Sequence, residues 1–114
     1  MPEIHATLSA SSAHRWLECT AAPSLEATVP SGSAVSEAAL EGTEAHSMAE
    51  AKLRAALEGR PAPAPTDNTE MEECTDAYVE FVLDAGKALA PAEVAVEQLV
   101  DFGHLVPGGF GTAD

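Results

Sequence analysis

Basic and aromatic residues are both scarce in this sequence of 114 residues. Five residues are Lys or Arg, against 19 Asp and Glu, so the formal net charge is −14. Affinity for nucleic-acid phosphates comes from Lys and Arg, so most of this surface should repel nucleic acid. Aromatic residues make up 4% of the chain, and alanine supplies much of the 46% that is hydrophobic. The length therefore allows one small domain with a thin, mostly aliphatic core.

Cysteines and long apolar runs are scarce as well. Cys19 and Cys74 lie far apart and form no Cys-x-x-Cys pair, which argues against a disulfide framework or a complete zinc site. The first residues have neither a basic nor an apolar region, so no signal peptide is expected. No apolar run approaches the roughly 18 residues of a membrane-spanning helix. These absences predict a soluble, cytoplasmic protein without a membrane partner.

The acidic balance fits three interpretations. It is typical of a salt-adapted or high-GC bacterial proteome. It also suits a metal-dependent site, in which carboxylates bind a cation. A protein that mimics DNA, and so occupies a DNA-binding partner, would have the same balance. Charge bears on solubility and association rather than on fold, so the three stay open at this point.

Hydrophobic periodicity and capping residues predict three helices along most of the chain. They are expected at about residues 11–19, 33–58 and 70–89. Between the first two, residues 22–33 contain two prolines, a glycine and several serines, a composition typical of a loop. Gly59 and Pro61 should end the second helix, and a proline- and alanine-rich linker follows over 60–68.

The third helix has the clearest amphipathic pattern. Asn68 or Thr69 is expected to cap its first turn, and Lys87 near its end suits the helix dipole. Acidic residues follow one side, and apolar residues follow the other. The apolar face is predicted to comprise Met71, Cys74, Tyr78, Phe81, Val82, Ala85 and Leu89.

After Pro91 the pattern changes to β-branched and alternating residues, which predicts a strand over 93–102. A glycine-rich connection follows, and Thr112 would open the returning strand of a hairpin over about 93–114. The sequence thus predicts an α/β or α+β fold with a helical region over about 9–89. Because a lone hairpin is marginal in water, we expect residues 1–114 to form a single partial domain with an incomplete sheet.

A first group of candidate site residues lies in the second predicted helix. His46 and Glu50 are four residues apart and share a helix face, and Gly42 lies four residues before His46. A glycine there would let another backbone, a metal or a phosphate approach closely. The structural alternative is a half-exposed histidine paired with Glu50, with Gly42 incidental.

A second candidate pair comprises Glu97 and Asp114. Glu97 lies on the predicted strand and Asp114 on its hairpin partner, so the two carboxylates can converge. Mg²⁺ prefers such hard oxygen ligands, and a bound cation can activate water and bind a phosphate during hydrolysis. The alternative is that both acids are solvated on an exposed face.

The first predicted helix offers basic residues. Arg15 and His14 could contact phosphate. Alternatively, Trp16 and Leu17 anchor the helix to the core, and both polar residues lie on the surface. Cys19 is more typical of a small buried residue than of a metal ligand.

Taken in order, these motifs resemble the RecB-like nucleases. The stretch LSASSAHRWLECT is similar to their N-terminal serine-rich helix, and EGTEAHSMAE is similar to their Gly-x-x-x-His-x-x-x-Glu helix. VEQLVDF and VPGGFGTAD resemble the strand pair that carries the first acid of the site. The resemblance covers essentially the whole chain and is greatest to a phage-encoded family, domain of unknown function 2800, placed in the PD-(D/E)XK superfamily.

The resemblance implies a restriction-endonuclease-type fold and a role for each matching residue. His46 and Asp114 would bind Mg²⁺ or Mn²⁺, with Glu97 as an auxiliary catalytic acid. The complete protein would cut DNA, and a phage recombination protein is a further implied partner. Cys19 falls where iron–sulfur members place their first cluster cysteine, but Cys74 does not match a second, so no cluster is expected.

The superfamily signature continues with a strand bearing (D/E)-x-K after the first acid, and this chain ends at Asp114. The resemblance therefore implies the N-terminal piece of a phage or prophage nuclease, inactive by itself. The alternative is a small acidic binding or inhibitor protein that mimics DNA or occupies a host defence nuclease. A third possibility is a structural or regulatory phage protein without catalysis.

Overall fold

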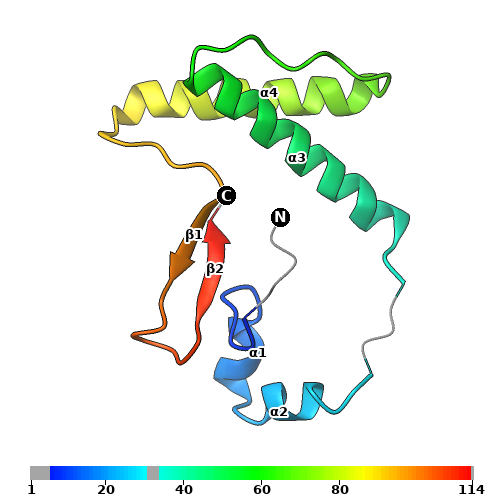
Figure 1. The fold of residues 1–114 in the computed structure, drawn as a ribbon, viewed down its shortest axis with the longest axis vertical. Coiled ribbons are helices and arrows are strands. Elements are labelled where there is room, and N and C mark those ends of the chain that lie inside the picture. The colour runs from blue at the N-terminus through cyan, green and yellow to red at the C-terminus, as the bar shows by residue number, and fades with distance from the viewer. Residues whose placement is uncertain (1–5, 31–33, 114) are drawn as a thin grey trace. The chain divides into compact units, whose positions relative to one another are not determined.

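The computed structural model describes residues 6–30 and 34–113 (Figure 1). The fold is α+β, which confirms the predicted class. In chain order the elements are α1 (Ala13–Glu18), α2 (Ala22–Glu26), α3 (Glu37–Leu57), α4 (Thr69–Leu89), β1 (Gln98–Asp101) and β2 (Phe110–Ala113). They form two compact units. The helical unit spans residues 35–96, and the hairpin unit combines residues up to 34 with those from 97 onward.

The prediction of a loop over 22–33 was wrong for its first part, because Ala22–Glu26 forms α2. Pro23 lies in the first turn of this helix. A proline there removes an N–H that no helical carbonyl would have accepted, so it starts a helix as readily as it marks a loop. The described chain therefore has four helices rather than the predicted three.

Capping residues fix both ends of α3. It begins later than the predicted residue 33, because the Ser36 side chain accepts a hydrogen bond from the Ala39 N–H at 3.2 Å. At the other end Gly59 has a φ of +67°, and the Arg60 N–H donates to the Ala55 carbonyl at 2.8 Å. This pattern is a Schellman motif, which glycine allows because it has no Cβ. The predicted stop at Gly59 is thus confirmed.

The predicted strand over 93–102 is shorter than expected. Only Gln98–Asp101 pairs with β2, in an antiparallel register that runs from Gln98 opposite Ala113 to Asp101 opposite Phe110. Glu97 has a φ of +52°, in the left-handed region, so the extended backbone is interrupted directly before β1. The alternation of apolar residues before Glu97 therefore belongs to an irregular segment.

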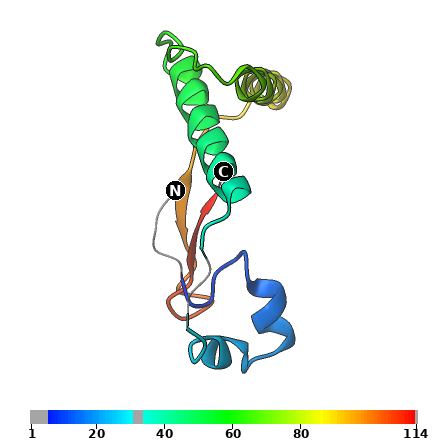
Figure 2. The same cartoon turned by 90° about the vertical axis from the view of Figure 1, so that its right-hand side faces the viewer.

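In the helical unit the C-terminal half of α3 crosses α4 (Figures 1 and 2). The buried residues at this crossing are Lys52, Leu53 and Ala55 of α3 with Met71 and Thr75 of α4. The predicted apolar face of α4 was partly wrong. Met71 is buried and Val82 and Ala85 are half-buried, but four of its members are exposed: Cys74, Tyr78, Phe81 and Leu89.

A buried lysine lies at the centre of the crossing. The Lys52 ammonium donates to Glu72 Oε2 at 2.5 Å, to Asp76 Oδ1 at 2.6 Å and to Thr75 Oγ1 at 2.9 Å. We call these four residues the Lys52 cluster. Glu72 also accepts a hydrogen bond from the Thr66 N–H at 2.7 Å, so its carboxylate ties the linker to both helices. A lysine is rarely buried unless its charge is paired, and here two carboxylates pair it.

The two charged partners shift each other's pKa. The hydrogen bond from Lys52, followed by that from the Thr66 N–H, holds the pKa of Glu72 below its ordinary 4.5. For Lys52, burial is the largest single influence and acts to lower the pKa. The hydrogen bonds and charges of Asp76 and Glu72 together outweigh it, so the pKa lies above its ordinary 10.5.

These shifts predict a pH window for the stability of the helical unit. The contribution of Glu72 is present above pH 4.5 and is lost as the pH falls through its lowered pKa. The contribution of Lys52 is present below pH 10.5 and is lost as the pH rises through its raised pKa. We expect the variant Glu72→Gln to differ from wild type most between these limits and progressively less below pH 4.5. Urea denaturation followed by circular dichroism across pH would measure this.

The neighbouring variant Glu73→Gln is the control, because Glu73 is exposed on the same turn of α4. It should leave the pH dependence close to that of wild type. A stability difference between Glu72→Gln and wild type that stays constant from neutral pH to about pH 3 would contradict the role given to Glu72.

In the hairpin unit, backbone hydrogen bonds hold the β1–β2 loop. The Phe102 N–H donates to Gly109 O at 2.9 Å, and the Gly109 N–H donates to Val106 O at 2.8 Å. Gly109 is buried, and a Cβ there would lie 2.5 Å from the Phe102 ring. At the N-terminal side, Trp16 Nε1 donates to Ser9 O at 2.9 Å, which folds the serine-rich segment onto α1.

Candidate functional site

Helix α3 carries three of the predicted site residues, Gly42, His46 and Glu50, at intervals of four. Residues four apart lie on the same side of a helix, one turn from each other. His46 and Glu50 are half-buried, whereas Gly42 is exposed. A Cβ added at Gly42 would meet no described atom within 4 Å. The side of α3 that carries His46 and Glu50 is therefore uncovered at Gly42, one turn before His46.

Glu50 forms an ion pair with Arg54, one turn further along α3. Arg54 Nε donates to Glu50 Oε1 at 2.8 Å, and Arg54 Nη2 donates to the Val96 carbonyl at 2.8 Å. The guanidinium is thus held at two points, within the helical unit. Glu50 has a positioning role toward Arg54 that its spacing from His46 did not predict.

A shallow depression lies on the same part of the helical unit. Its lining residues come from α3 and from the linker that follows: Ser47, Glu50, Ala51, Arg54, Arg60 and Pro63. The four from α3 are spaced so that they share one face of the helix. Glu50 thus belongs both to this depression and to the line of predicted residues.

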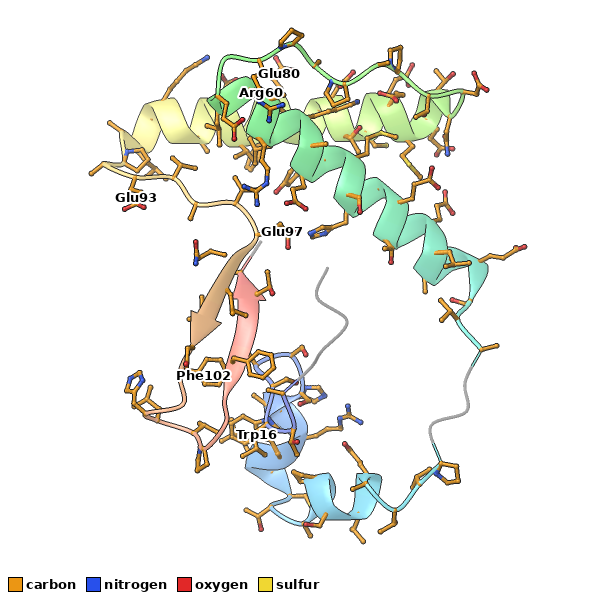
Figure 3. All side chains as sticks on the ribbon, in the orientation of Figure 1. Trp16, Arg60, Glu80, Glu93, Glu97 and Phe102 are labelled. Atoms are coloured by element: carbon orange, nitrogen blue, oxygen red, sulfur yellow. The ribbon has the colours of Figure 1, made fainter. Side chains whose placement is uncertain are left out.

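Arg60 reaches the depression because of how α3 ends. It follows Gly59, and the Schellman motif fixes its backbone just beyond the helix (Figure 3). Its Nε donates to Glu58 Oε2 at 2.5 Å, and its side chain is 57% exposed. Neither Arg54 nor Arg60 is among the site residues predicted from the sequence. The available signals were the Glu50–Arg54 spacing of four and the residue following the helix-ending glycine.

Of the two acids predicted for the hairpin, Glu97 and Asp114, the structure describes Glu97. Glu97 lies directly before β1 (Figure 3), and it is half-buried. Asp114 lies outside the described residues. The register pairs Gln98 with Ala113, which are the sequence neighbours of Glu97 and Asp114. Glu97 belongs to the hairpin unit and His46 to the helical unit.

Arg15, the predicted phosphate contact, forms an ion pair with Glu26. Its Nη1 lies 3.0 Å from Glu26 Oε1, and both side chains are about half exposed, at 58% and 50%. This pair links α1 to α2. His14, the other basic candidate, is exposed on α1.

The described residues do not by themselves fit a metal ion. Within 6–30 and 34–113, no group of three or more His, Cys, Asp or Glu side chains is placed to hold one. Cys19 and Cys74 are free and exposed. Any metal site that includes Asp114 extends outside the described part of the chain.

The model of a family described as a protein of unknown function, DUF2800, matches residues 5–114. Because the match spans nearly the whole sequence, the chain belongs to the DUF2800 family. No solved structure matches it. Among the described residues, no helix is long and apolar enough to cross a membrane.

Proposed function

We propose that this chain forms the N-terminal part of a RecB-like, metal-dependent DNA nuclease of the PD-(D/E)XK superfamily, encoded by a phage or prophage. The observation that carries the proposal is the spacing of Gly42, His46 and Glu50 on α3, followed along the chain by an antiparallel hairpin. The motifs that resemble these nucleases lie in order within residues 5–114, which are also the residues that match the DUF2800 family.

In this proposal His46, Glu97 and Asp114 are the catalytic residues, and His46 and Asp114 bind the metal. Mg²⁺ or Mn²⁺ is the cofactor expected of the complete nuclease. The substrate would be DNA, with a phage recombination protein as a partner, and the reaction would take place in the host cytoplasm.

The test compares two proteins from the same gene. One is the chain of 114 residues, and the other is the same chain extended through the codons that follow. Each is incubated with linear and circular DNA and with Mg²⁺ or Mn²⁺. We expect cleavage by the extended protein only, because the (D/E)-x-K element of the superfamily follows the first acid. The variants His46→Ala and Asp114→Asn of the extended protein should be about a hundredfold slower or worse.

The control variant is Glu93→Gln, which removes an exposed acid from the segment between α4 and β1 (Figure 3). It should cleave at the wild-type rate. An extended protein that folds but leaves DNA intact with both metals refutes the nuclease proposal. Robust cleavage by the chain of 114 residues refutes the expectation that it is inactive alone.

A second candidate function is binding of a basic protein, as a DNA mimic or an inhibitor of a host defence nuclease. Helix α4 favours it, because Phe81 and Leu89 are 73% and 79% exposed and acidic residues such as Glu80 and Asp84 are exposed beside them. Exposed aromatic residues are typical of protein interfaces.

Competition with DNA distinguishes the two functions. A mimic displaces DNA from a DNA-binding protein, it folds by itself, and it is weakened by Phe81→Ser but not by His46→Ala. A nuclease instead cleaves the DNA. Its cleavage is lost in His46→Ala and retained in Phe81→Ser, since His46 is needed for cleavage and Phe81 is not.

A further inference from the structure

We propose that the depression beside the C-terminal end of α3 binds a phosphate group through Arg54 and Arg60. Its lining also includes Ser47, whose hydroxyl is a further hydrogen-bond donor on the same helix face. The proposal assigns a ligand site to Arg54 and Arg60, for which the nuclease resemblance implies no role. Only the identification of DNA as the source of the phosphate rests on the proposed function.

The distribution of basic residues is the first reason. The sequence has five Lys and Arg residues against 19 acids, and two of the five line this depression. The other three are placed differently: Lys52 is buried in the Lys52 cluster, Lys87 pairs with Asp84 on α4, and Arg15 pairs with Glu26. A chain that is strongly acidic thus brings two guanidinium groups to one concave surface.

The orientation of Arg54 is the second reason. Two of its five N–H donors are used, one by Glu50 and one by the Val96 carbonyl. These contacts fix the plane of the guanidinium and leave three donors for a ligand. Phosphate oxygens match the planar geometry of such a group, and a side chain already held in place loses little rotamer freedom on binding.

Arg60 is positioned by the backbone rather than by its side chain. The hydrogen bond from its N–H to Ala55 O and the restricted φ of Pro61 hold the chain in place on both sides. Its Nε pairs with Glu58, and this contact does not use the donors of its Nη1 and Nη2 atoms. Glu50 and Glu58 offset part of the positive charge, so binding should be weak, in the millimolar range, and sensitive to salt.

The experiment is an NMR titration of the full chain with inorganic phosphate, with sodium chloride added to constant ionic strength. We expect shifts for the backbone of Ser47, Ala51 and Arg60 and for the guanidinium of Arg54. The variant Arg60→Gln should bind about five- to tenfold more weakly. Lys87→Gln is the control, because Lys87 is likewise exposed and also pairs with a carboxylate, that of Asp84. It should bind phosphate as wild type does.

A second titration uses a short DNA duplex instead of phosphate. Shifts at the same residues support DNA as the source of the phosphate. Phosphate binding without duplex binding supports the site and overturns DNA as its source. Absence of phosphate-specific shifts, or equal losses in Arg60→Gln and Lys87→Gln, overturns the site itself. Phosphate binding requires no cleavage, so this result is independent of the nuclease assay.

Discussion

Replacing Lys52 by methionine is expected to lower the free energy of unfolding of the helical unit by roughly 1–3 kcal/mol. The Lys52 side chain is 8% exposed, and its ammonium joins α3 to three residues of α4. Methionine has a similar length but no charge, so Glu72 would lose its main partner inside the crossing. The loss should be smaller than for a fully buried pair, because Asp76 is 69% exposed and can be rehydrated. Urea denaturation followed by circular dichroism gives the free energy directly.

The control for this prediction is Lys87→Met. Lys87 also pairs with an aspartate on α4, at 3.1 Å from Asp84, but its side chain is 79% exposed. Exposed pairs contribute about 0–1 kcal/mol, so the control should change stability little. Equal losses for the two variants would show that the Lys52 cluster does not stabilise the crossing.

Substitution of Gly109 by alanine is expected to destabilise the hairpin unit by roughly 1–3 kcal/mol. The new Cβ would lie 2.5 Å from two atoms of the Phe102 ring and 2.9 Å from Val106 O. The ring can turn, but the carbonyl belongs to the backbone and accepts the Gly109 N–H, so the loop itself must move. Thermal unfolding together with the amide shifts of Gln98–Asp101 would report the change.

The control for Gly109→Ala is Gly42→Ala, the same substitution at a glycine that has room for a Cβ. No described atom lies within 4 Å of a Cβ at Gly42, and the residue lies inside α3. Alanine favours a helix by about 1 kcal/mol over glycine, so this variant should be more stable than wild type. A destabilised Gly42→Ala, or a neutral Gly109→Ala, would contradict the packing described for the two glycines.

Much of the fold follows from local sequence signals. Asn68 caps α4 by accepting a hydrogen bond from the Met71 N–H at 3.1 Å, as its side chain predicts. Gly59 ends α3 because glycine readily adopts the positive φ that the Schellman motif requires. The inward face of α4 could not be predicted, because the stripe of Cys74, Tyr78 and Phe81 is apolar and regular in sequence. The structure instead buries Thr75, which donates to the Met71 carbonyl and accepts from Lys52.

The candidate site was predictable only where it depends on helix spacing. The positions of His46 and Glu50 on one face of α3 follow from an interval of four residues. The part played by Arg54 depends on Val96, which is 42 residues away in sequence, and no local pattern indicates that contact. The place of Arg60 depends on the geometry of the helix end. The sequence pattern predicts that α3 ends at Gly59, but it does not predict where the chain places Arg60.

The helical unit interrupts the hairpin unit in the chain, since residues 35–96 separate its two segments. The contacts of α3 with α4 are local enough to form early, whereas the first segment of the hairpin unit must wait for the second to be synthesised. Closing a loop costs less entropy when the loop is already compact. The rate at which the two segments of the hairpin unit come together should therefore depend on the helix crossing. A substitution at Lys52 would then also slow the association of α1 and α2 with the hairpin, to which Lys52 contributes no contact.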